Sequence, residues 1–427
     1  MSAQLTFAII GLGGRGMYAY GQRIFKQPDE MLITAVADII PEKVQRAKTT
    51  FNLKNEQCFN SAEELLSKEK LADIAVIATQ DKQHYQHAMA ALRKGYHLLL
   101  EKPISPSLSE CIGIRDEAQR RGLTVTVCHV LRYSPFFRAI KELIAGGAIG
   151  KVCSVDLVEN VAYWHQAHSF VRGNWRNSTE SSPMILAKSC HDLDILYYLL
   201  DVSCRRISSY GSLSWFKKEN APAGSAPYCV DAADCRPNCP YDAQKIYVDK
   251  CADIFAKGGK AGWPFNVVTP DPTLHTLMEA LKTSPYGRCV YHCDNDVVDH
   301  QVVAMDFEGG ITATFTMTAF TYDGTRRIQV MGSLGEITGD LSEGKLFLKK
   351  YGEAVKQVAM PDDSRDGHGG GDALMLQTLK EAVTNGGKGA LTGIAQSVHS
   401  HVMALAAEHS RLNKGIAVDL SAFEKQK

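Results

Sequence analysis

The stretch Leu5-Thr-Phe-Ala-Ile-Ile-Gly-Leu-Gly-Gly-Arg-Gly16 determines the fold of the first third of this 427-residue chain. Its first six residues form a nearly continuous apolar run, as expected for a parallel strand that is buried on both faces. Glycines then follow in the spacing G-x-G-x-x-G, and the residues after them are compatible with a helix. A strand, a glycine turn and a helix in this order predict a dinucleotide-binding turn.

The glycines of this turn have separate tasks. Gly11 permits the tight turn, Gly13 lets a pyrophosphate approach the backbone, and Gly16 lets helix and strand pack closely. The phosphates would then meet N–H groups at the positive end of the helix dipole. Asp38 ends the second strand, where its carboxylate can bind both ribose hydroxyls and would repel a 2′-phosphate. Because Ile39 supplies no cation in its place, the sequence predicts NAD rather than NADP; the alternative is a structural glycine turn beside a surface aspartate.

Strands and helices alternate up to about residue 130. Such alternation implies right-handed crossovers and a parallel sheet. After Leu5–Ile10 we expect strands at Leu32–Ala37, Ile74–Ala78, His97–Leu100 and Thr124–Cys128, with intervening helices that include Ala62–Ser67 and His84–Lys94.

The pattern changes after Arg132 to a helix and then to runs that alternate as in an antiparallel sheet. We expect a helix at Phe136–Ala145, strands at Lys151–Glu159, Arg206–Ser214, His300–Asp306, Ile311–Thr318 and Arg327–Met331, a hairpin turn at Gly309-Gly310, and a last helix at Ile394–Arg411. The sequence thus predicts an α/β protein with two domains, 1–130 and 131–427. The second domain carries a cysteine-containing insertion at about Lys217–Gly262, and Asp362–Asp372 is expected to be a mobile loop.

Composition narrows the class of protein. The chain has 47 basic and 47 acidic side chains, and this balance argues against nucleic acid or an anionic membrane as the main partner. No apolar run approaches the roughly 20 residues that cross a bilayer. Met1–Gln4 lacks the features of a signal peptide, so a cytoplasmic location is expected.

The motif Glu101-Lys102-Pro103-Ile104 follows the fourth expected strand, at the sheet edge where ligands of parallel sheets bind. A lysine there can hydrogen-bond a substrate hydroxyl and stabilise negative charge that develops as hydride leaves the carbon. Its pKa could be lowered by desolvation or by a nearby nicotinamide cation. A salt-bridged surface lysine beside a structural proline is the alternative.

Several motifs together resemble the glucose–fructose oxidoreductase/inositol dehydrogenase/MocA family. They are Gly11–Gly16, Asp38, Thr79-Gln80-Asp81 with His84, Glu101-Lys102-Pro103, Gly147-Ala-Ile-Gly150-Lys-Val and His191-Asp192-Leu193-Asp194. The resemblance covers most of the chain and is densest in residues 5–200. It implies an N-terminal Rossmann domain with a parallel sheet, then an α/β domain with a large, open, mostly antiparallel sheet. It also implies hydride transfer with NAD or NADP on a sugar, inositol or related carbinol, and a homo-oligomer, a dimer or tetramer.

The resemblance assigns roles to individual residues. Lys102 matches the family's catalytic or substrate-orienting lysine, and His191 matches its proton-transfer histidine, with Asp194 one helical turn further on. A histidine also suits this task because its intrinsic pKa lies near working pH. The expected cofactor contacts are Gly11, Leu12, Gly13, Gly14, Arg15, Gly16, Asp38, Thr79, Gln80, His84, Glu101 and Lys102.

One position departs from the family pattern. Many members have an aspartate four residues before the histidine, but here that residue is Ala187, followed by Lys188. Simple inositol-dehydrogenase chemistry is therefore in doubt. Lys188 could bind a substrate oxygen or anion, or lower the pKa of His191 by charge repulsion.

An aromatic and basic stretch, Tyr163–Arg176, precedes His191. Aromatic faces stack on sugar rings, and arginine, histidine and asparagine donate to hydroxyl or carboxylate groups. A loop that its tryptophans pin to the core is the alternative. The expected substrate contacts are Lys102, Arg132, Tyr133, Arg172, Trp175, Lys188 and His191.

Six of the twelve cysteines lie in or after the insertion: Cys229, Cys235, Cys239, Cys251, Cys289 and Cys293. Four thiolates could bind zinc, but the spacings contain no CxxC pair, which favours scattered thiols and no metal. A metal, if present, would pin the insertion and would not take part in hydride chemistry.

The sequence thus predicts an NAD-dependent oxidoreductase acting on a secondary hydroxyl or ketone of a sugar, sugar derivative or inositol-like carbinol. The resemblance leaves open an NAD-dependent glycosidase that works by transient oxidation, elimination and re-reduction. A non-catalytic sensor that binds cofactor is a third hypothesis, which the presence of both Lys102 and His191 disfavours.

Overall fold

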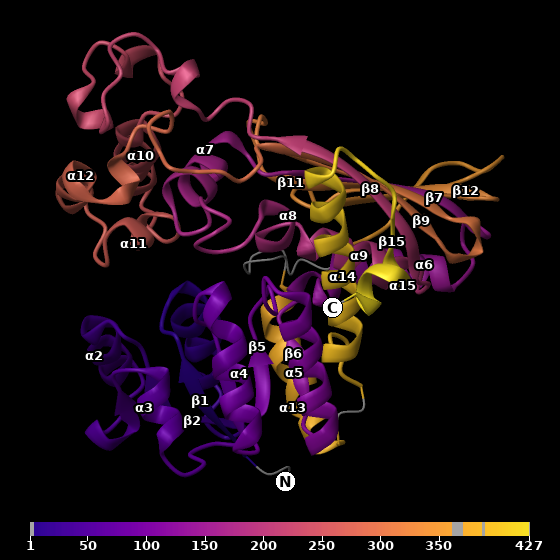
Figure 1. The fold of residues 1–427 in the computed structure, drawn as a ribbon, viewed down its shortest axis with the longest axis horizontal. Helices are drawn as coiled ribbons and strands as arrows, with labels where there is room; N and C mark the ends of the chain where they lie inside the picture. The colour runs from indigo at the N-terminus through magenta and orange to yellow at the C-terminus, as the bar shows by residue number, and fades with distance from the viewer. Residues whose placement is uncertain (1–3, 361–369, 387–388, 427) are drawn as a thin grey trace.

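A computed structural model describes residues 4–360, 370–386 and 389–426. Figure 1 shows two sheets: the N-terminal sheet lies in the lower part of the view, and a larger sheet extends across the upper right. The fold is the predicted one, a Rossmann sheet followed by a large, mostly antiparallel sheet. Helices of the second half lie between the two sheets, so the sheets share one buried core.

The N-terminal sheet has six parallel strands in the order β3-β2-β1-β4-β5-β6. Its central strands are buried on both faces because helices cover each side, which explains their continuous apolar runs. The strands are β1 (Leu5–Ile10), β2 (Met31–Ala37), β3 (Cys58–Phe59), β4 (Ile74–Ile77), β5 (His97–Leu100) and β6 (Val125–Val127), and the helices between them are η1 (Gly14–Gly21), α1 (Gln22–Phe25), α2 (Pro41–Thr50), α3 (Ala62–Ser67), α4 (His84–Arg93) and α5 (Leu108–Arg121).

The second sheet has nine strands in the order β14-β13-β12-β11-β7-β10-β9-β8-β15. One face packs on helices, so buried and exposed residues alternate along strands such as β9. The strands are β7 (Val152–Asn160), β8 (Cys204–Ser212), β9 (His300–Phe307), β10 (Thr312–Thr318), β11 (Thr325–Gly332), β12 (Gly335–Asp340), β13 (Lys345–Lys350), β14 (Lys356–Gln357) and β15 (Val418–Asp419). The helices are α6 (Pro135–Ala145), α8 (Met184–Ala187), α9 (Cys190–Leu200), α14 (Ile394–Leu412) and α15 (Leu420–Lys425).

Two local predictions need correction. The strand expected at Lys151–Glu159 is β7, which is antiparallel to β11 but parallel to β10. The loop expected at Asp362–Asp372 falls largely outside the described residues, but its end is helical because α13 begins at Gly371. The hairpin at Gly309-Gly310 is confirmed, with both glycines at positive φ between β9 and β10.

Helix α13 (Gly371–Thr384) packs on the N-terminal sheet although it belongs to the last part of the chain (Figure 1). Its side chains Met375, Leu376 and Leu379 share a buried cluster with Phe7 and Ile9 of β1. The chain therefore returns to the first sheet after β14 and before β15, the last strand of the second sheet. The division at residue 130 stays a prediction.

After Gly262, the predicted end of the insertion, the chain does not return to the second sheet until β9. Helices α11 (Phe265–Val268) and α12 (Leu274–Thr283) follow, and Figure 1 shows this part of the chain as a separate lobe near α7 (Tyr163–Gln166). Leu277 and Leu281 pack there in a cluster with Tyr247. These apolar side chains pack within the lobe, and the bounds of the insertion stay a prediction. Among the described residues, no helix combines the length and apolar composition that crossing a membrane requires.

Candidate active site

The glycine turn after β1 leaves its backbone open on one side. Gly11 has a φ of +94°, and a Cβ there would lie 2.4 Å from the carbonyl oxygen of Ala78. A Cβ at Gly16 would lie 1.9 Å from the carbonyl oxygen of Gly11, so only glycine permits this close packing. A Cβ at Gly13 or Gly14 would meet no atom within 4 Å. The turn therefore fits the approach of a pyrophosphate to its backbone.

The carboxylate of Asp38 lies beside this turn. Its Oδ2 accepts a hydrogen bond from the N–H of Leu12 at 2.7 Å, and its Oδ1 accepts one from the N–H of Ile40 at 2.9 Å. The Nζ of Lys43 on α2 lies 3.9 Å from Oδ2 of Asp38. Lys43 is thus a positive charge beside Asp38 that the sequence prediction, based on Ile39 alone, did not include.

Arg15 and Glu101, both predicted cofactor contacts, bind each other. The Nε of Arg15 lies 2.6 Å from Oε1 of Glu101, and its Nη2 lies 2.6 Å from Oδ1 of Asp372 at the start of α13. The hydroxyl of Tyr20 also donates to Glu101. Burial alone would raise the pKa of Glu101, but Arg15 holds it below its usual range. These contacts fix the turn to the end of β5 and to α13.

Lys102 lies where β5 meets the second half of the chain. Its Nζ donates to the carbonyl oxygen of Ala187, at the end of α8, at 2.7 Å. The following Lys102–Pro103 peptide bond is cis. His84 joins this turn to the end of β4, since its Nδ1 lies 2.7 Å from the carbonyl oxygen of Pro103 and its Nε2 lies 3.1 Å from that of Thr79. His84 thus supports the turn that carries Lys102.

His191 lies in the first turn of α9 and is buried against His129, two residues after the end of β6. The two rings meet edge to face with centroids 5.7 Å apart, and His401 of α14 lies 5.5 Å from His129 on another side. The Nδ1 of His129 is 3.9 Å from Oδ2 of Asp194. Burial, with a further contribution from the charges of Arg132 and Lys102, lowers the pKa of His129 to about 4, so this ring is neutral near pH 7.

The sequence analysis missed His129. It is fully buried, and neither ring nitrogen has a hydrogen-bond partner in the described part of the chain. A position directly after a parallel strand lies at the edge where ligands bind. Applying that rule to the fifth strand, as well as to the fourth, would have identified it.

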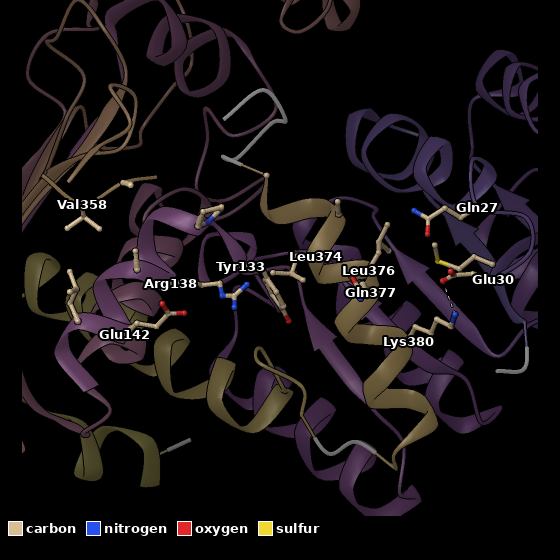
Figure 2. A pocket seen from close by; sticks show the side chains of 17 residues that line it. Gln27, Glu30, Tyr133, Arg138, Glu142, Val358, Leu374, Leu376, Gln377 and Lys380 are labelled. Atoms are coloured by element: carbon tan, nitrogen blue, oxygen red, sulfur yellow. Dashed lines mark hydrogen bonds and ion pairs between the residues drawn. The ribbon is translucent and has the colours of Figure 1, made fainter. Parts of the chain in front are cut away.

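Arg132 and Tyr133, two predicted substrate contacts, have their polar groups on protein partners. Arg132 forms a bidentate ion pair with Asp194, with Nε and Nη2 at 2.7 and 2.6 Å from the carboxylate oxygens. The hydroxyl of Tyr133 lies 2.9 Å from Oγ1 of Thr392. Tyr133 also lines a crevice of about 1370 Å³ along α13, shown in Figure 2. This crevice contains none of the other predicted site residues.

Lys188 belongs to a buried network of charges. Its Nζ lies 3.2 Å from Oε1 of Glu159 on β7. Arg326 of β11 contacts Oε2 of Glu159 at 2.7 Å and Oδ1 of Asp192 at 2.8 Å. Two cations thus face two carboxylates, and Glu159 supplies the anion that balances Lys188. Burial raises the pKa of Asp192 to about 6 against the opposing effect of Arg326.

Trp175 connects the second half of the chain to the N-terminal sheet. Its Nε1 donates to Oδ1 of Asp81 at 3.2 Å, and the hydroxyl of Ser181 donates to Oδ2 of Asp81 at 3.0 Å. Asp81 follows Gln80, an exposed residue after β4. Arg172, in contrast, is fully buried in the lobe, where its Nε donates to the carbonyl oxygen of Arg288 at 2.6 Å. Trp175 therefore borders the candidate site, and Arg172 lies inside the lobe.

His165 of α7 is a further imidazole near both lysines. Burial, followed by the positive charges of Lys188, His168, Arg326 and Lys102, holds its pKa well below the usual range. A neutral imidazole of this kind can accept or donate a hydrogen bond to a hydroxyl group. Within the described residues, no group of three His, Cys, Asp or Glu side chains is arranged to hold a metal ion.

Two family models match almost the whole chain. The N-terminal domain of an oxidoreductase family, with an NAD-binding Rossmann fold, matches residues 5–129, and that family's C-terminal α/β domain matches residues 141–420. The glycine turn and Asp38 fit this cofactor, because the open side at Gly13 and Gly14 admits a pyrophosphate and Asp38 lies beside it.

Individual relatives agree with these matches. The chain is 25% identical to the oxidoreductase YteT of Bacillus subtilis over 327 residues. These residues make up 72% of this chain and 72% of YteT. It is 26% identical over 194 residues to an inositol 2-dehydrogenase/D-chiro-inositol 3-dehydrogenase of Lactiplantibacillus plantarum, over 45% of this chain and 51% of that protein. The solved structure of an inositol dehydrogenase homologue from Azotobacter vinelandii, complexed with NAD+, shares the fold with a TM-score of 0.70 and 16% identity over 98% of both chains. With both domains matched in order, the chain belongs to the glucose–fructose oxidoreductase/inositol dehydrogenase/MocA family of oxidoreductases.

Proposed function

We propose that this protein catalyses NAD-dependent oxidation of a secondary hydroxyl group, or the reverse reduction of a ketone, in a sugar, sugar derivative or inositol-like carbinol. One observation carries the proposal. The ring of His191 packs edge to face on His129, and the charge of Lys102, which comes from the other half of the chain, acts on the same His129 ring. The inositol 2-dehydrogenase among the relatives supports this substrate class.

The chain's own residues handle the proton of the hydroxyl group. The imidazole of His191 accepts it as the carbon is oxidised, and His129 holds that ring in place from its edge. The ammonium group of Lys102, held by the carbonyl oxygen of Ala187, donates to the same substrate oxygen and stabilises its negative charge. NAD, when bound along Gly11–Gly16 and Asp38, supplies the hydride acceptor.

Substrate contacts are proposed for a smaller set than the sequence predicted. Trp175 lies at the border between the two halves of the chain and suits the apolar face of a sugar ring. His165 lies near Lys102 and Lys188 and suits the hydroxyl groups of the ring. Lys188 is not in this set, because its ammonium group is paired with Glu159. Arg132, Tyr133 and Arg172 support the surrounding structure through their protein partners.

A library of sugars, sugar acids and inositols tests the proposal. Purified protein is incubated with each compound and NAD, and absorbance at 340 nm reports formation of NADH. A dehydrogenase produces NADH in proportion to substrate consumed. Cleavage of a glycoside without net NADH would instead identify the redox-neutral glycosidase, and cofactor binding with neither reaction would identify a sensor.

A further inference from the structure

The lobe contains a buried cation with no carboxylate partner. Arg172 has no exposed surface, and its guanidinium donates to the carbonyl oxygens of Arg288 and Tyr241 at 2.6 and 2.7 Å. Within residues 4–360, 370–386 and 389–426, no acidic side chain forms an ion pair with it, and its Nη1 has no hydrogen-bond partner. A buried charge of this kind requires a nearby anion.

The sulfur of Cys229 lies 3.7 Å from Nη2 of Arg172, where an anion would balance the charge of the guanidinium. Cys229 is almost buried, with 7% of its surface exposed. A hydrogen bond from the Cys289 thiol, and then the charge of Arg172, lower the pKa of Cys229 to about 6 against the effect of burial. The Cys289 thiol and the guanidinium of Arg172 thus both favour the thiolate form of Cys229.

The sulfur of Cys229 lies 3.8 Å from the carbonyl oxygen of Arg288, the residue just before Cys289, and a hydrogen bond joins the two thiols. Tyr228 and Arg288, the residues just before the two cysteines, form an antiparallel β-bridge. The N–H of Cys289 donates to the carbonyl oxygen of Pro227 at 2.9 Å. This bridge joins segments about sixty residues apart in the sequence.

We infer that Cys229 and Cys289 form a redox-active dithiol that a hydroperoxide converts to a disulfide. The Cys229 thiolate attacks one oxygen of hydrogen peroxide, the O–O bond breaks, and the departing hydroxide takes up a proton to form water. The sulfur of Cys289 then attacks the sulfenic acid. The S–S bond forms as the S–O bond breaks, and the departing hydroxide leaves as a second water with the proton of Cys289. The two sulfurs thus supply the two electrons that reduce the peroxide.

The chemistry of Arg172 favours this reaction over metal binding. A guanidinium beside the sulfur stabilises a nucleophilic thiolate, whereas it would repel a metal cation at the same atom. No group of three metal-binding side chains is present among the described residues. The site is therefore assigned to a peroxide rather than to zinc.

Oxidation also changes the border of the candidate active site. The disulfide removes the anion beside Arg172. Arg172 is the last residue of the η5 helix (Ala167–Arg172), which ends shortly before Trp175. Trp175 in turn binds Asp81. Loss of charge balance at Arg172 is therefore expected to displace Trp175. The dithiol chemistry is independent of the proposed dehydrogenase activity, and only an effect on turnover rests on it.

Mass spectrometry of the full-length protein tests the inference. Reduced protein is treated with hydrogen peroxide, digested without reductant and searched for linked peptides. We expect a Cys229–Cys289 cross-link that dithiothreitol reverses, and an accompanying fluorescence change that the Trp175→Phe variant lacks. In Cys289→Ser, the reaction is expected to stop at a sulfenic acid on Cys229, which dimedone traps.

Cys153→Ser is the matched control, because Cys153 is an exposed cysteine on β7 and lies outside the lobe cluster that contains the pair. This variant should form the cross-link as readily as the parent protein. Preferential oxidation of Cys153, a cross-link between other cysteines, or stoichiometric zinc that protects Cys229 and Cys289 would each overturn the inference. A cross-link that leaves the fluorescence of Trp175 unchanged would overturn its connection to the active site.

Discussion

The guanidinium of Arg15 lies 2.6 Å from the carboxylate of Asp372, a residue 357 positions later in the chain. Arg15 belongs to the glycine turn, and Asp372 is the second residue of α13. Because Arg15 also binds Glu101 at the end of β5, one side chain fixes the turn to a strand and to a C-terminal helix. The shape of the cofactor turn thus depends on a helix outside the predicted N-terminal domain.

The ion pair of Asp372 leads to a stability prediction. Asp372→Asn removes the charge that α13 contributes to Arg15, although Arg15 keeps Glu101 as a partner. Hydrogen bonds to charged groups contribute about 1.5–3 kcal/mol, so we expect the free energy of unfolding to fall by about that amount. Urea unfolding monitored by circular dichroism measures it. Glu381→Gln, an exposed acid-to-amide change on the same helix, is the control and should alter stability by less than about 0.5 kcal/mol.

The proposed catalytic pair leads to a kinetic prediction. Lys102→Ala and His191→Ala should each lower turnover at least about a hundredfold, because each removes a group that acts on the substrate oxygen. Neither residue lies in the glycine turn, so NAD affinity should change less than about tenfold, or about 1.4 kcal/mol. The double variant should be little slower than either single one, since groups that act as a unit are non-additive.

Turnover is measured at 340 nm with the best substrate from the library, and NAD affinity by fluorescence titration. Lys151→Ala, an exposed lysine at the start of the second sheet, should keep the activity of the parent protein. Near-normal turnover of His191→Ala between pH 6 and 9 would show that this histidine is structural, and Lys188 would then be tested next.

The surroundings of Asp38 lead to a prediction on cofactor choice. We expect NAD to bind at least tenfold more tightly than NADP, about 1.4 kcal/mol, because Asp38 would repel a 2′-phosphate. Asp38→Ser should reduce the preference for NAD over NADP, since the positive charge of Lys43 then remains without the carboxylate of Asp38. Asp38→Ser/Lys43→Ala should bind NADP more weakly than Asp38→Ser alone. Titration of both cofactors against the three proteins decides the matter, and equal affinities in the parent protein would exclude the ribose role of Asp38.

The buried position of His129 leads to a prediction on pH. Its pKa is about 4 in the folded protein and about 6.5 when unfolded, so between these values the unfolded chain binds one more proton. Stability from this residue is therefore present above pH 6.5 and is lost as the pH falls towards 4. In His129→Phe, the free energy of unfolding should fall less steeply than in the parent protein as the pH drops from 6.5 to 4. The difference between the two slopes should be up to about 1.4 kcal/mol per pH unit.

Denaturant unfolding at several pH values, on His129→Phe and on the parent protein, measures this slope. An exposed histidine, His275, supplies the control, because its replacement by Phe should leave the slope unchanged. Parallel slopes for His129→Phe and the parent protein would mean that His129 is not neutral in the folded state.

The strands of the first sheet could be predicted because their burial is a local property. A strand covered on both faces needs apolar residues at every position, and this pattern lies within a few residues of sequence. The predicted Leu5–Ile10 and His97–Leu100 match β1 and β5. The extent of the insertion was harder to predict, because the sequence of α12 does not show which hydrophobic core its apolar side chains join.

The sequence by itself determined the glycine turn, Asp38, the motif at Lys102 and the helix of His191, because each is a residue type at a fixed distance from its own strand or helix. Only the tertiary structure decided what surrounds them. Lys43 beside Asp38, His129 beside His191 and Glu159 beside Lys188 meet across different elements. Such pairs depend on strand order and helix packing, which bring together segments that no local spacing relates. The local sequence pattern therefore determined where the candidate site residues lie along the chain. Tertiary packing determined which charged groups and partners surround them.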